Sequence, residues 1–229
     1  AKIRLNPGNI RDRRHVERVI AACRERGVPI RIGVNEGSVV ERRDMRVRAA
    51  EQAGLARDYQ QYLVELMVSK LADYVRIFER VGFEELVLSA KTVSPVLAIA
   101  VYRRLSSQFD YPLHLGITHA GPPETGRIRS IAALAALLAD GIGDTIRISY
   151  SAEPVCEVTD AKELLCSLGL RPRTEPVLIA CPTCGRVEVD LLGLVAQVRR
   201  RLAGIKLPIK VAVMGCTVNG PGEAREADV

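Results

Sequence analysis

The sequence contains no tryptophan, and aromatic residues make up only 4% of its 229 residues. Proteins that bind single-stranded nucleic acid stack the bases on aromatic side chains, so this scarcity argues against such a platform. The basic residues are scattered along the chain instead of forming one stripe. The net charge of +6 admits an anionic ligand, although a solvated basic surface is its simpler explanation. We therefore expect no nucleic-acid partner.

Long apolar runs are also missing. No stretch reaches the eighteen or so apolar residues of a membrane span, and the first residues lack the apolar region of a signal peptide. We expect a cytoplasmic protein with no membrane partner, whose six cysteines are thiols or metal ligands instead of disulfides. The chain opens directly on a strand-like segment and stops soon after a glycine-rich motif, so we also expect a fragment.

Short apolar segments alternate with helical patterns along the chain, which predicts an α/β fold of parallel βαβ units. A composition shift over residues 151–175 predicts two domains, 1–155 and 156–229. The cysteine motifs that contain Cys181, Cys184 and Cys216 all lie in the second domain. The predicted strands are residues 2–6, 29–35, 85–91, 112–118 and 144–150, with later ones near 175–180 and 209–215. The predicted helices are about 11–26, 58–81, 94–107, 126–140, 160–168 and 188–203.

The first five predicted strands have one apolar face and one unusually polar face. Parallel strands covered on both faces read as almost continuously apolar, so a consistent polar face suggests that it lines a site. Four cations on this face suit a doubly charged group such as a diphosphate, because guanidinium groups match phosphate oxygens. The alternatives are a solvent-facing side of an open sheet and inward ion pairs. The candidate anion-binding residues are Arg4, Asn6, Arg31, Asn35, Lys91, Arg147 and Ser149.

Three cysteines form the candidate metal site. Cys181 and Cys184 are separated by two residues, and Cys216 follows later in a glycine-rich segment. Thiolates select zinc, copper(I) or iron–sulfur centres. A structural zinc normally has four Cys or His ligands, yet no histidine follows His119 and the nearest fourth candidate is Glu223. The pattern therefore does not decide between a structural zinc and an iron–sulfur cluster in which one iron has no cysteine ligand.

The remaining cysteines have a simpler explanation. Cys23 and Cys166 lie within helical patterns, and Cys156 lies on a connection. Because unpaired cysteine behaves as a small hydrophobic residue, we expect core or incidental roles for all three.

Six motifs in register resemble those of the 4-hydroxy-3-methylbut-2-enyl diphosphate synthase family of isoprenoid biosynthesis, in its bacterial two-domain form. The resemblance covers nearly the whole chain. The motifs are RLNPGN at 4–9, PIRIGVN at 29–35, HLGIT at 114–118, GIGDTIR at 141–147, CPTC at 181–184 and GCTVNGPGE at 215–223.

This resemblance implies a TIM barrel, present here from about its fourth to its eighth strand, followed by a smaller iron–sulfur domain that is incomplete at its C-terminal end. It implies a 4Fe–4S cluster held by Cys181, Cys184, Cys216 and Glu223, and a barrel mouth that binds 2-C-methyl-D-erythritol 2,4-cyclodiphosphate. The implied activity is an oxidoreductase: the ring opens and a hydroxyl is removed with two electrons. Flavodoxin or ferredoxin would supply the electrons, and a homodimer would place each cluster domain over its partner's barrel.

One position departs from the family pattern. The family usually has glutamate where this chain has His119, after the seventh barrel strand. Histidine can also exchange a proton near neutral pH, so His119 is a second candidate catalytic residue beside Glu223. Two other hypotheses stay open: a non-catalytic zinc-binding module on a phosphate-binding barrel, and a zinc-dependent hydrolase of phosphorylated substrates.

Overall fold

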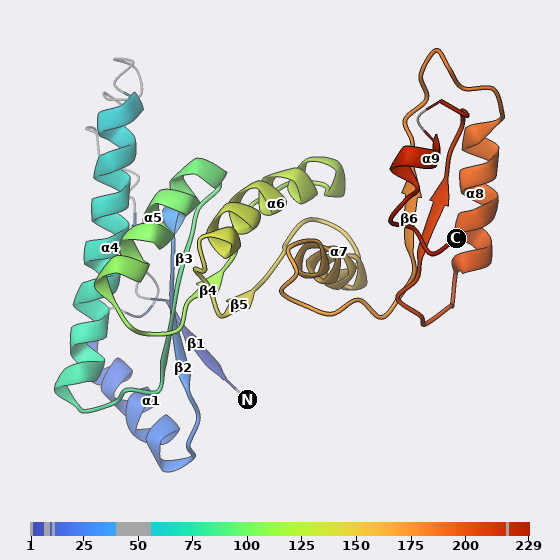
Figure 1. Cartoon of the computed structure of the whole chain (residues 1–229). Helices are drawn as coiled ribbons and strands as arrows, with labels where there is room; N and C mark the ends of the chain where they lie inside the picture. Colours follow the sequence, from blue (N-terminus) through green and yellow to red (C-terminus); the bar gives the residue numbers. More distant parts are fainter. Residues whose placement is uncertain (1, 7–9, 11, 40–55, 219) are drawn as a thin grey trace. The chain divides into compact units, whose positions relative to one another are not determined.

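The computed structural model describes residues 2–6, 10, 12–39, 56–218 and 220–229. The chain divides into two compact units, Ala1–Leu168 and Gly169–Val229, which are described separately below (Figure 1). In the described residues, no helix combines the length and the apolar character that crossing a membrane requires.

The described residues of the first unit form five parallel strands. β1, β2 and β3 form one sheet, β4 and β5 form a pair, and a bridge between Leu88 and Leu113 links β3 to the start of β4. All five strands fall inside the predicted segments, which confirms the α/β fold with parallel strands. The strands are β1 (Ile3–Leu5), β2 (Ile30–Asn35), β3 (Leu86–Lys91), β4 (His114–Leu115) and β5 (Thr145–Ile146).

Helices connect successive strands of this unit. The Asp12 carboxylate caps α1 by accepting a hydrogen bond from the Arg14 amide, and the Ser94 hydroxyl caps α5 in the same way, followed by Pro95 at the first helical position. The helices are α1 (Arg13–Glu25), α2 (Glu36–Val39), α4 (Ala56–Arg80), α5 (Pro95–Gln108), α6 (Pro123–Ala139) and α7 (Pro154–Ser167). The last begins at Pro154 and not near residue 160 as predicted, because its first turn carries no apolar stripe for the periodicity to detect.

The two faces of the sheet differ as the sequence predicts. Ile30, Ile32 and Val34 alternate along β2 and are fully buried in the core with residues of α1, α4 and α5. The residues between them belong to the opposite face, where Arg4 of β1 lies beside Arg31 of β2 in the register. The helices therefore cover the apolar face, and the polar face carries the candidate anion-binding residues.

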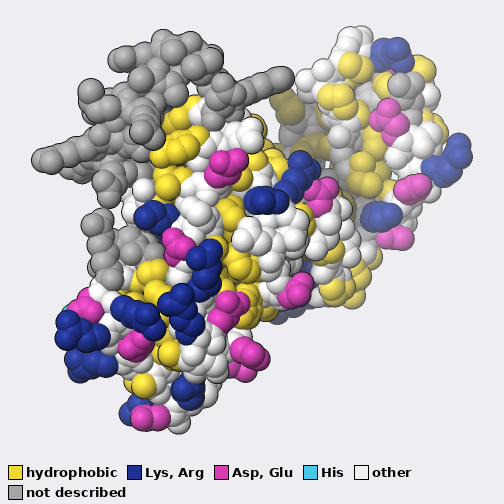
Figure 2. All heavy atoms as spheres, turned by 90° about the vertical axis from the view of Figure 1, so that its left-hand side faces the viewer, with side chains coloured by type: hydrophobic (Ala, Val, Ile, Leu, Met, Phe, Trp, Pro, Cys, Tyr) yellow, Lys and Arg dark blue, Asp and Glu magenta, His cyan; other side chains and the backbone are white. Residues whose placement is uncertain are grey.

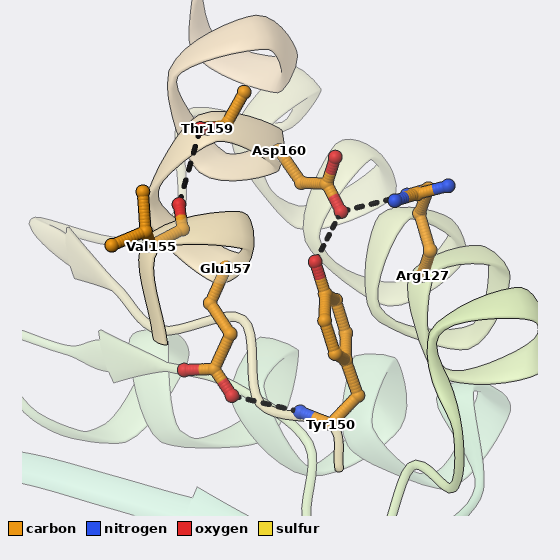
Figure 3. Close-up of polar contacts among 6 residues, drawn as sticks. All are labelled: Arg127, Tyr150, Val155, Glu157, Thr159 and Asp160. Atoms are coloured by element: carbon orange, nitrogen blue, oxygen red, sulfur yellow. Dashed lines mark hydrogen bonds and ion pairs between the residues drawn. The ribbon is translucent and has the colours of Figure 1, made fainter. Parts of the chain in front are cut away.

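Polar contacts hold α7 in the first unit (Figure 3). The Asp160 carboxylate accepts hydrogen bonds from Nε of Arg127 at 2.7 Å and from the Tyr150 hydroxyl at 2.6 Å. The Glu157 carboxylate accepts one from the Tyr150 amide at 3.0 Å. The two units divide at Leu168, at the end of this helix, whereas the boundary expected from the sequence lies at residue 155, near its start.

The second unit is a smaller βαβ arrangement. The parallel strands β6 (Val177–Ala180) and β7 (Lys210–Val213) are joined through α8 (Leu191–Leu202), and the short helix α9 (Gly220–Glu223) follows β7. The Asp190 carboxylate caps α8 by accepting a hydrogen bond from the Gly193 amide. Because both strands are parallel, their carboxyl ends lie at the same edge, and the cysteine motifs begin there.

Candidate metal centre and anion site

The candidate anion-binding cations occupy adjacent strands of the first unit. Arg4 and Arg31 are register neighbours, and Lys91 ends β3 beside Asn35 of β2. Arg147 adds to the repulsion that lowers the pKa values of Lys91 and Arg31, and its carbonyl oxygen and the Lys91 ammonium both lie beside Gly116. The structure thus brings together all four cations that the sequence singled out.

Gly116 lies beside the Lys91 side chain and against the backbone of Arg147. A Cβ atom at Gly116 would lie 3.4 Å from Nζ of Lys91 and only 2.8 Å from the carbonyl oxygen of Arg147. A side chain here would therefore clash with the Arg147 carbonyl group and touch the Lys91 ammonium. Glycine just after β4 thus allows the close approach to the Arg147 backbone, with Lys91 alongside.

Amide and hydroxyl groups connect the cations to the strand ends. Nη2 of Arg4 donates to Oδ1 of Asn35 at 3.4 Å and to the carbonyl oxygen of Gly33 at 3.4 Å. The Ser38 hydroxyl lies 3.4 Å from Oδ1 of Asn6 and 2.7 Å from the Asn35 carbonyl oxygen. Asn6, Asn35 and Arg4 are therefore held in one connected group, and Ser38 is a member that the strand pattern could not reveal.

Within the described part of the chain, none of Arg4, Arg31, Lys91 and Arg147 forms an ion pair. Burial, with Arg147, Arg31 and Arg4 nearby, lowers the pKa of Lys91 to about 7, although Glu157 opposes the shift. Burial and Arg4 also lower the pKa of Arg31. An anion bound here would relieve this repulsion.

His114 lies at the start of β4 among the same cations. Burial, followed by Lys91 and Arg31, lowers its pKa to about 3, so the imidazole is neutral at physiological pH. Nδ1 lies 2.8 Å from the Thr145 hydroxyl, and Nε2 is buried without a hydrogen-bond partner among the described residues. The ring borders a cavity of about 320 Å³ with Arg4 and Arg31. The alternating pattern marked His114 as polar but gave no reason to assign it a role.

Two further candidates lie beyond the ends of β4 and β5. His119 is exposed and has a positive φ of 52°, and its Nδ1 lies 3.3 Å from the Thr118 hydroxyl. Ser149 is half-buried and precedes Tyr150, whose amide is held by Glu157. The backbone turn therefore fixes the position of His119, and the contact of Glu157 with the neighbouring Tyr150 amide fixes that of Ser149.

Positive charge alone does not distinguish the anion site from the rest of the surface. Figure 2 shows Lys and Arg side chains gathered over the lower part of one face, at the height of α1 in Figure 1. Several of the basic residues of α1 are exposed, and Arg13 pairs with Glu17 at 2.8 Å. These are ordinary solvated charges, whereas the cations of the anion site share a strand face and form no ion pair with the acidic residues that the structure describes.

The candidate metal centre lies at the carboxyl edge of β6 and β7. Cys181 directly follows β6, Cys216 follows β7, and Glu223 is the last residue of α9. Together with Cys184 they line one cavity of about 580 Å³. The amide of Gly215 donates a hydrogen bond to Sγ of Cys181 at 3.2 Å. The fold therefore brings together all four groups that the sequence proposed as ligands.

The chemistry of the donor set is compatible with an iron–sulfur cluster. Thiolates are soft ligands, and the cysteines of such a cluster each bind a different iron. Three thiols and one carboxylate line the cavity, and among the residues that the structure describes no group of three such side chains is drawn together around one point.

The other cysteines lie elsewhere. Cys23 is 3% exposed in the core of the first unit, as expected, Cys166 is half-buried, and Cys156 is exposed near the start of α7. None of the three borders the cavity of the candidate metal centre.

Comparisons with known proteins agree with these features. Residues 1–162 match the GcpE TIM-barrel domain, and residues 177–229 match the GcpE protein C-terminal domain. The α/β fold with parallel strands and the TIM-barrel assignment of the first part are thereby supported.

Relatives with curated names include proteins from Anoxybacillus flavithermus, Shouchella clausii and Geobacter sulfurreducens, each called 4-hydroxy-3-methylbut-2-en-1-yl diphosphate synthase (flavodoxin). They are 47%, 49% and 48% identical to the chain over 100%, 100% and 99% of its length. The chain spans 59%, 59% and 61% of these relatives. The match of both domain families, with the motifs in register, shows that the chain belongs to the GcpE family.

Proposed function

We propose that the protein of which this chain is a part reduces 2-C-methyl-D-erythritol 2,4-cyclodiphosphate to 4-hydroxy-3-methylbut-2-enyl diphosphate. The relatives that carry this activity in their names align with the chain over almost its entire length. In the reaction, the ring C–O bond to phosphate breaks, a hydroxyl leaves as water, and two electrons and a proton are consumed. The protein must therefore hold a diphosphate, receive electrons and deliver a proton.

The cation group of the first unit provides the diphosphate site in this proposal. Arg4, Arg31 and Arg147 would bind phosphate oxygens through paired N–H groups, and Lys91 would contribute a point charge. Asn6, Asn35 and Ser149 would complete the hydrogen bonds at the strand ends. Within the described residues, none of the four cations forms an ion pair with an acidic side chain. This supports the role, because the cations repel one another until an anion binds.

The cavity of the second unit provides the redox site. Cys181, Cys184 and Cys216 would hold three irons of a 4Fe–4S cluster, and Glu223 would hold the fourth. When bound, such a cluster supplies electrons one at a time at an iron that has no cysteine ligand. Glu223, which is exposed on the short helix α9, would be the carboxylate beside that iron and could hold a proton there.

The remaining parts of the proposal concern proton transfer and partners. His119, on its left-handed turn, would hold or deliver a proton at the mouth of the barrel. Flavodoxin, named with the relatives, or ferredoxin would donate the electrons. A homodimer of two-domain subunits, barrel and cluster domain, would bring the cluster of one subunit to the barrel of the other in the cytoplasm.

The observation that carries this proposal is the convergence of three cysteines and Glu223 on one cavity of the second unit. The test is to purify the full-length protein without oxygen, measure iron, sulfide and zinc, and assay the cyclic diphosphate with reduced flavodoxin. We expect about four irons and four sulfides per chain together with turnover. Stoichiometric zinc without sulfide would instead support the non-catalytic zinc module and exclude the reductive enzyme.

A further inference from the structure

The hydrogen bonding between β3 and β4 is interrupted halfway along the strands. At one end the amide of Leu88 donates to the Pro112 carbonyl oxygen at 2.8 Å, and at the other the amide of Thr118 donates to the Thr92 carbonyl oxygen at 2.9 Å. Between them, the amide of Ala90 does not take part in a strand-to-strand bond, because it donates to a side chain at 3.2 Å.

The inserted side chain is Tyr102 of α5. Its hydroxyl accepts the hydrogen bond from the Ala90 amide and donates to the His114 carbonyl oxygen at 2.8 Å. The Ser89 hydroxyl lies 3.5 Å away. Two hydrogen bonds in series therefore replace one direct bond between the strands, which holds β3 and β4 further apart at this point than a regular parallel ladder would.

The hydroxyl is permanently protonated and fixed. Tyr102 has no exposed surface, and burial raises its pKa to about 12, so it keeps the proton that it donates. A buried ring on the inner face of α5 has few rotamers available, and an orphaned amide or carbonyl would be costly. The Tyr102 hydroxyl is thus an integral part of the hydrogen bonding between β3 and β4.

The widened gap lies directly beside the anion site. Ala90 immediately precedes Lys91 in β3, and His114 lies two residues before Gly116, on the same strand side. Nζ of Lys91 lies 3.4 Å from the position that a Cβ atom on Gly116 would take, so the two are in contact distance of each other. The separation of the two backbones here determines how much room the Lys91 ammonium has beside Gly116.

We propose that Tyr102 is a positioning residue for the anion site: its hydroxyl holds β3 and β4 apart so that Lys91 can lie beside Gly116 and reach a bound phosphate group. This inference rests on the proposed function, because it assigns Tyr102 to the same diphosphate site. A purely structural role, in which Tyr102 only fills the core, is the alternative that an experiment must separate.

The experiment compares Tyr102→Phe with Tyr74→Phe in the full-length protein. Tyr74 is also a buried tyrosine whose hydroxyl donates to a backbone carbonyl, that of Ile10, so its variant measures the general effect of losing such a bond. Without the Tyr102 hydroxyl, the Ala90 amide and the His114 carbonyl group can pair directly and close the gap. We expect the KM for the cyclic diphosphate to rise about tenfold in Tyr102→Phe and at most about twofold in Tyr74→Phe, with kcat less affected.

A second readout does not depend on substrate. Titration of lysine ammonium resonances by NMR follows Lys91 directly, and expulsion from its buried place should move its pKa in Tyr102→Phe from about 7 toward the ordinary lysine value. An unchanged Lys91 titration together with a KM like that of the control would overturn the inference. If wild-type protein fails to bind the cyclic diphosphate, the proposed function fails, while the Lys91 titration still decides whether Tyr102 positions this side chain.

Discussion

The amide of Gly215 donates a hydrogen bond to Sγ of Cys181 at 3.2 Å and so joins the first cysteine motif to the last. Hydrogen bonds to a sulfur stabilise its thiolate and tune the reduction potential of a cluster bound to it. Gly215 is buried and immediately precedes Cys216, so the same backbone turn orients two of the proposed ligands. The two motifs are therefore positioned as one unit.

Replacing one of these ligands should remove the cluster. In Cys216→Ser we expect anaerobically purified protein to lose most of its iron and sulfide, because the hydroxyl is a much poorer ligand than a thiolate. The measurement is iron and sulfide per chain, with the absorbance of the cluster as a second readout. Cys156→Ser is the matched control, since Cys156 is exposed and lies outside the cavity. A Cys216→Ser protein with the full iron content would remove Cys216 from the ligand set.

Glu223 should matter for turnover more than for cluster retention. Three thiolates remain in Glu223→Ala, so much of the iron and sulfide should stay bound, while turnover falls by about a hundredfold or more because the carboxylate that would hold the proton and the fourth iron is lost. The control is Glu226→Ala, an exposed carboxylate on the same segment. Unchanged activity in Glu223→Ala would exclude this residue from the site.

Local sequence patterns predicted much of this architecture. The strands were found because apolar residues such as Ile30, Ile32 and Val34 recur with a period of two and are buried together. The grouping of the three cysteines was predicted from their spacing and thiolate chemistry, and the structure supplies the reason that they meet: Cys181 and Cys216 follow parallel strands whose carboxyl ends lie at one edge.

Features that depend on tertiary distances could not be read from the chain. Tyr102 looks like any apolar residue on the buried stripe of a helix, and its hydroxyl gains a role only from the separation of β3 and β4. The neutral state of His114 likewise depends on burial among cations from four other segments. The start of α7 was missed because its anchor residues, Glu157 and Asp160, are polar and contact other segments.

The contacts of Asp160 predict a stability effect. Its carboxylate is 17% exposed and accepts hydrogen bonds from Arg127 and Tyr150 (Figure 3). Burial opposes the charged form of Asp160, but these hydrogen bonds outweigh it and lower the pKa. The stabilisation is therefore present above the ordinary carboxylate pKa and is lost as the pH falls through the lowered value.

At neutral pH, Asp160→Asn should reduce the free energy of unfolding by about 1–3 kcal/mol, measured by chemical denaturation. Asp73→Asn provides the control, because the Asp73–Arg76 pair is exposed on one helix and should contribute less than about 0.5 kcal/mol. Equal effects of the two substitutions would show that the α7 contacts do not stabilise the first unit.

His119 offers a matched pair of substitutions. Gln and Glu have the same shape and meet the same backbone requirement at a positive φ, but only Glu can exchange a proton. If His119 handles a proton, His119→Gln should lower kcat by about a hundredfold, whereas His119→Glu should retain most of the activity. The substrate KM should change little in either variant. Equal kcat values for the two variants would assign His119 a polar role without proton transfer.

Lys91 predicts how substrate binding depends on pH. Burial, and then Arg147, Arg31 and Arg4, lower its pKa to about 7 in the free protein, so the side chain is charged below that pH and increasingly neutral above it. A bound diphosphate favours the charged form, and binding must therefore take up a proton whenever Lys91 is neutral. Affinity for the cyclic diphosphate should be highest below pH 7 and should fall above it by up to about tenfold per pH unit.

Calorimetric titration of the full-length protein across neutral pH measures this dependence, and the heat in buffers of different ionisation enthalpy reports the proton uptake. The cyclic diphosphate has no group that titrates near neutrality, so the slope belongs to the protein. Lys91→Arg is the control, because guanidinium stays charged throughout and should flatten the profile. Lys91 is buried and faces three other cations, which is why we expect it to be partly neutral. If the wild-type profile is as flat as that of Lys91→Arg, the ammonium is already charged before substrate binds and the prediction is wrong.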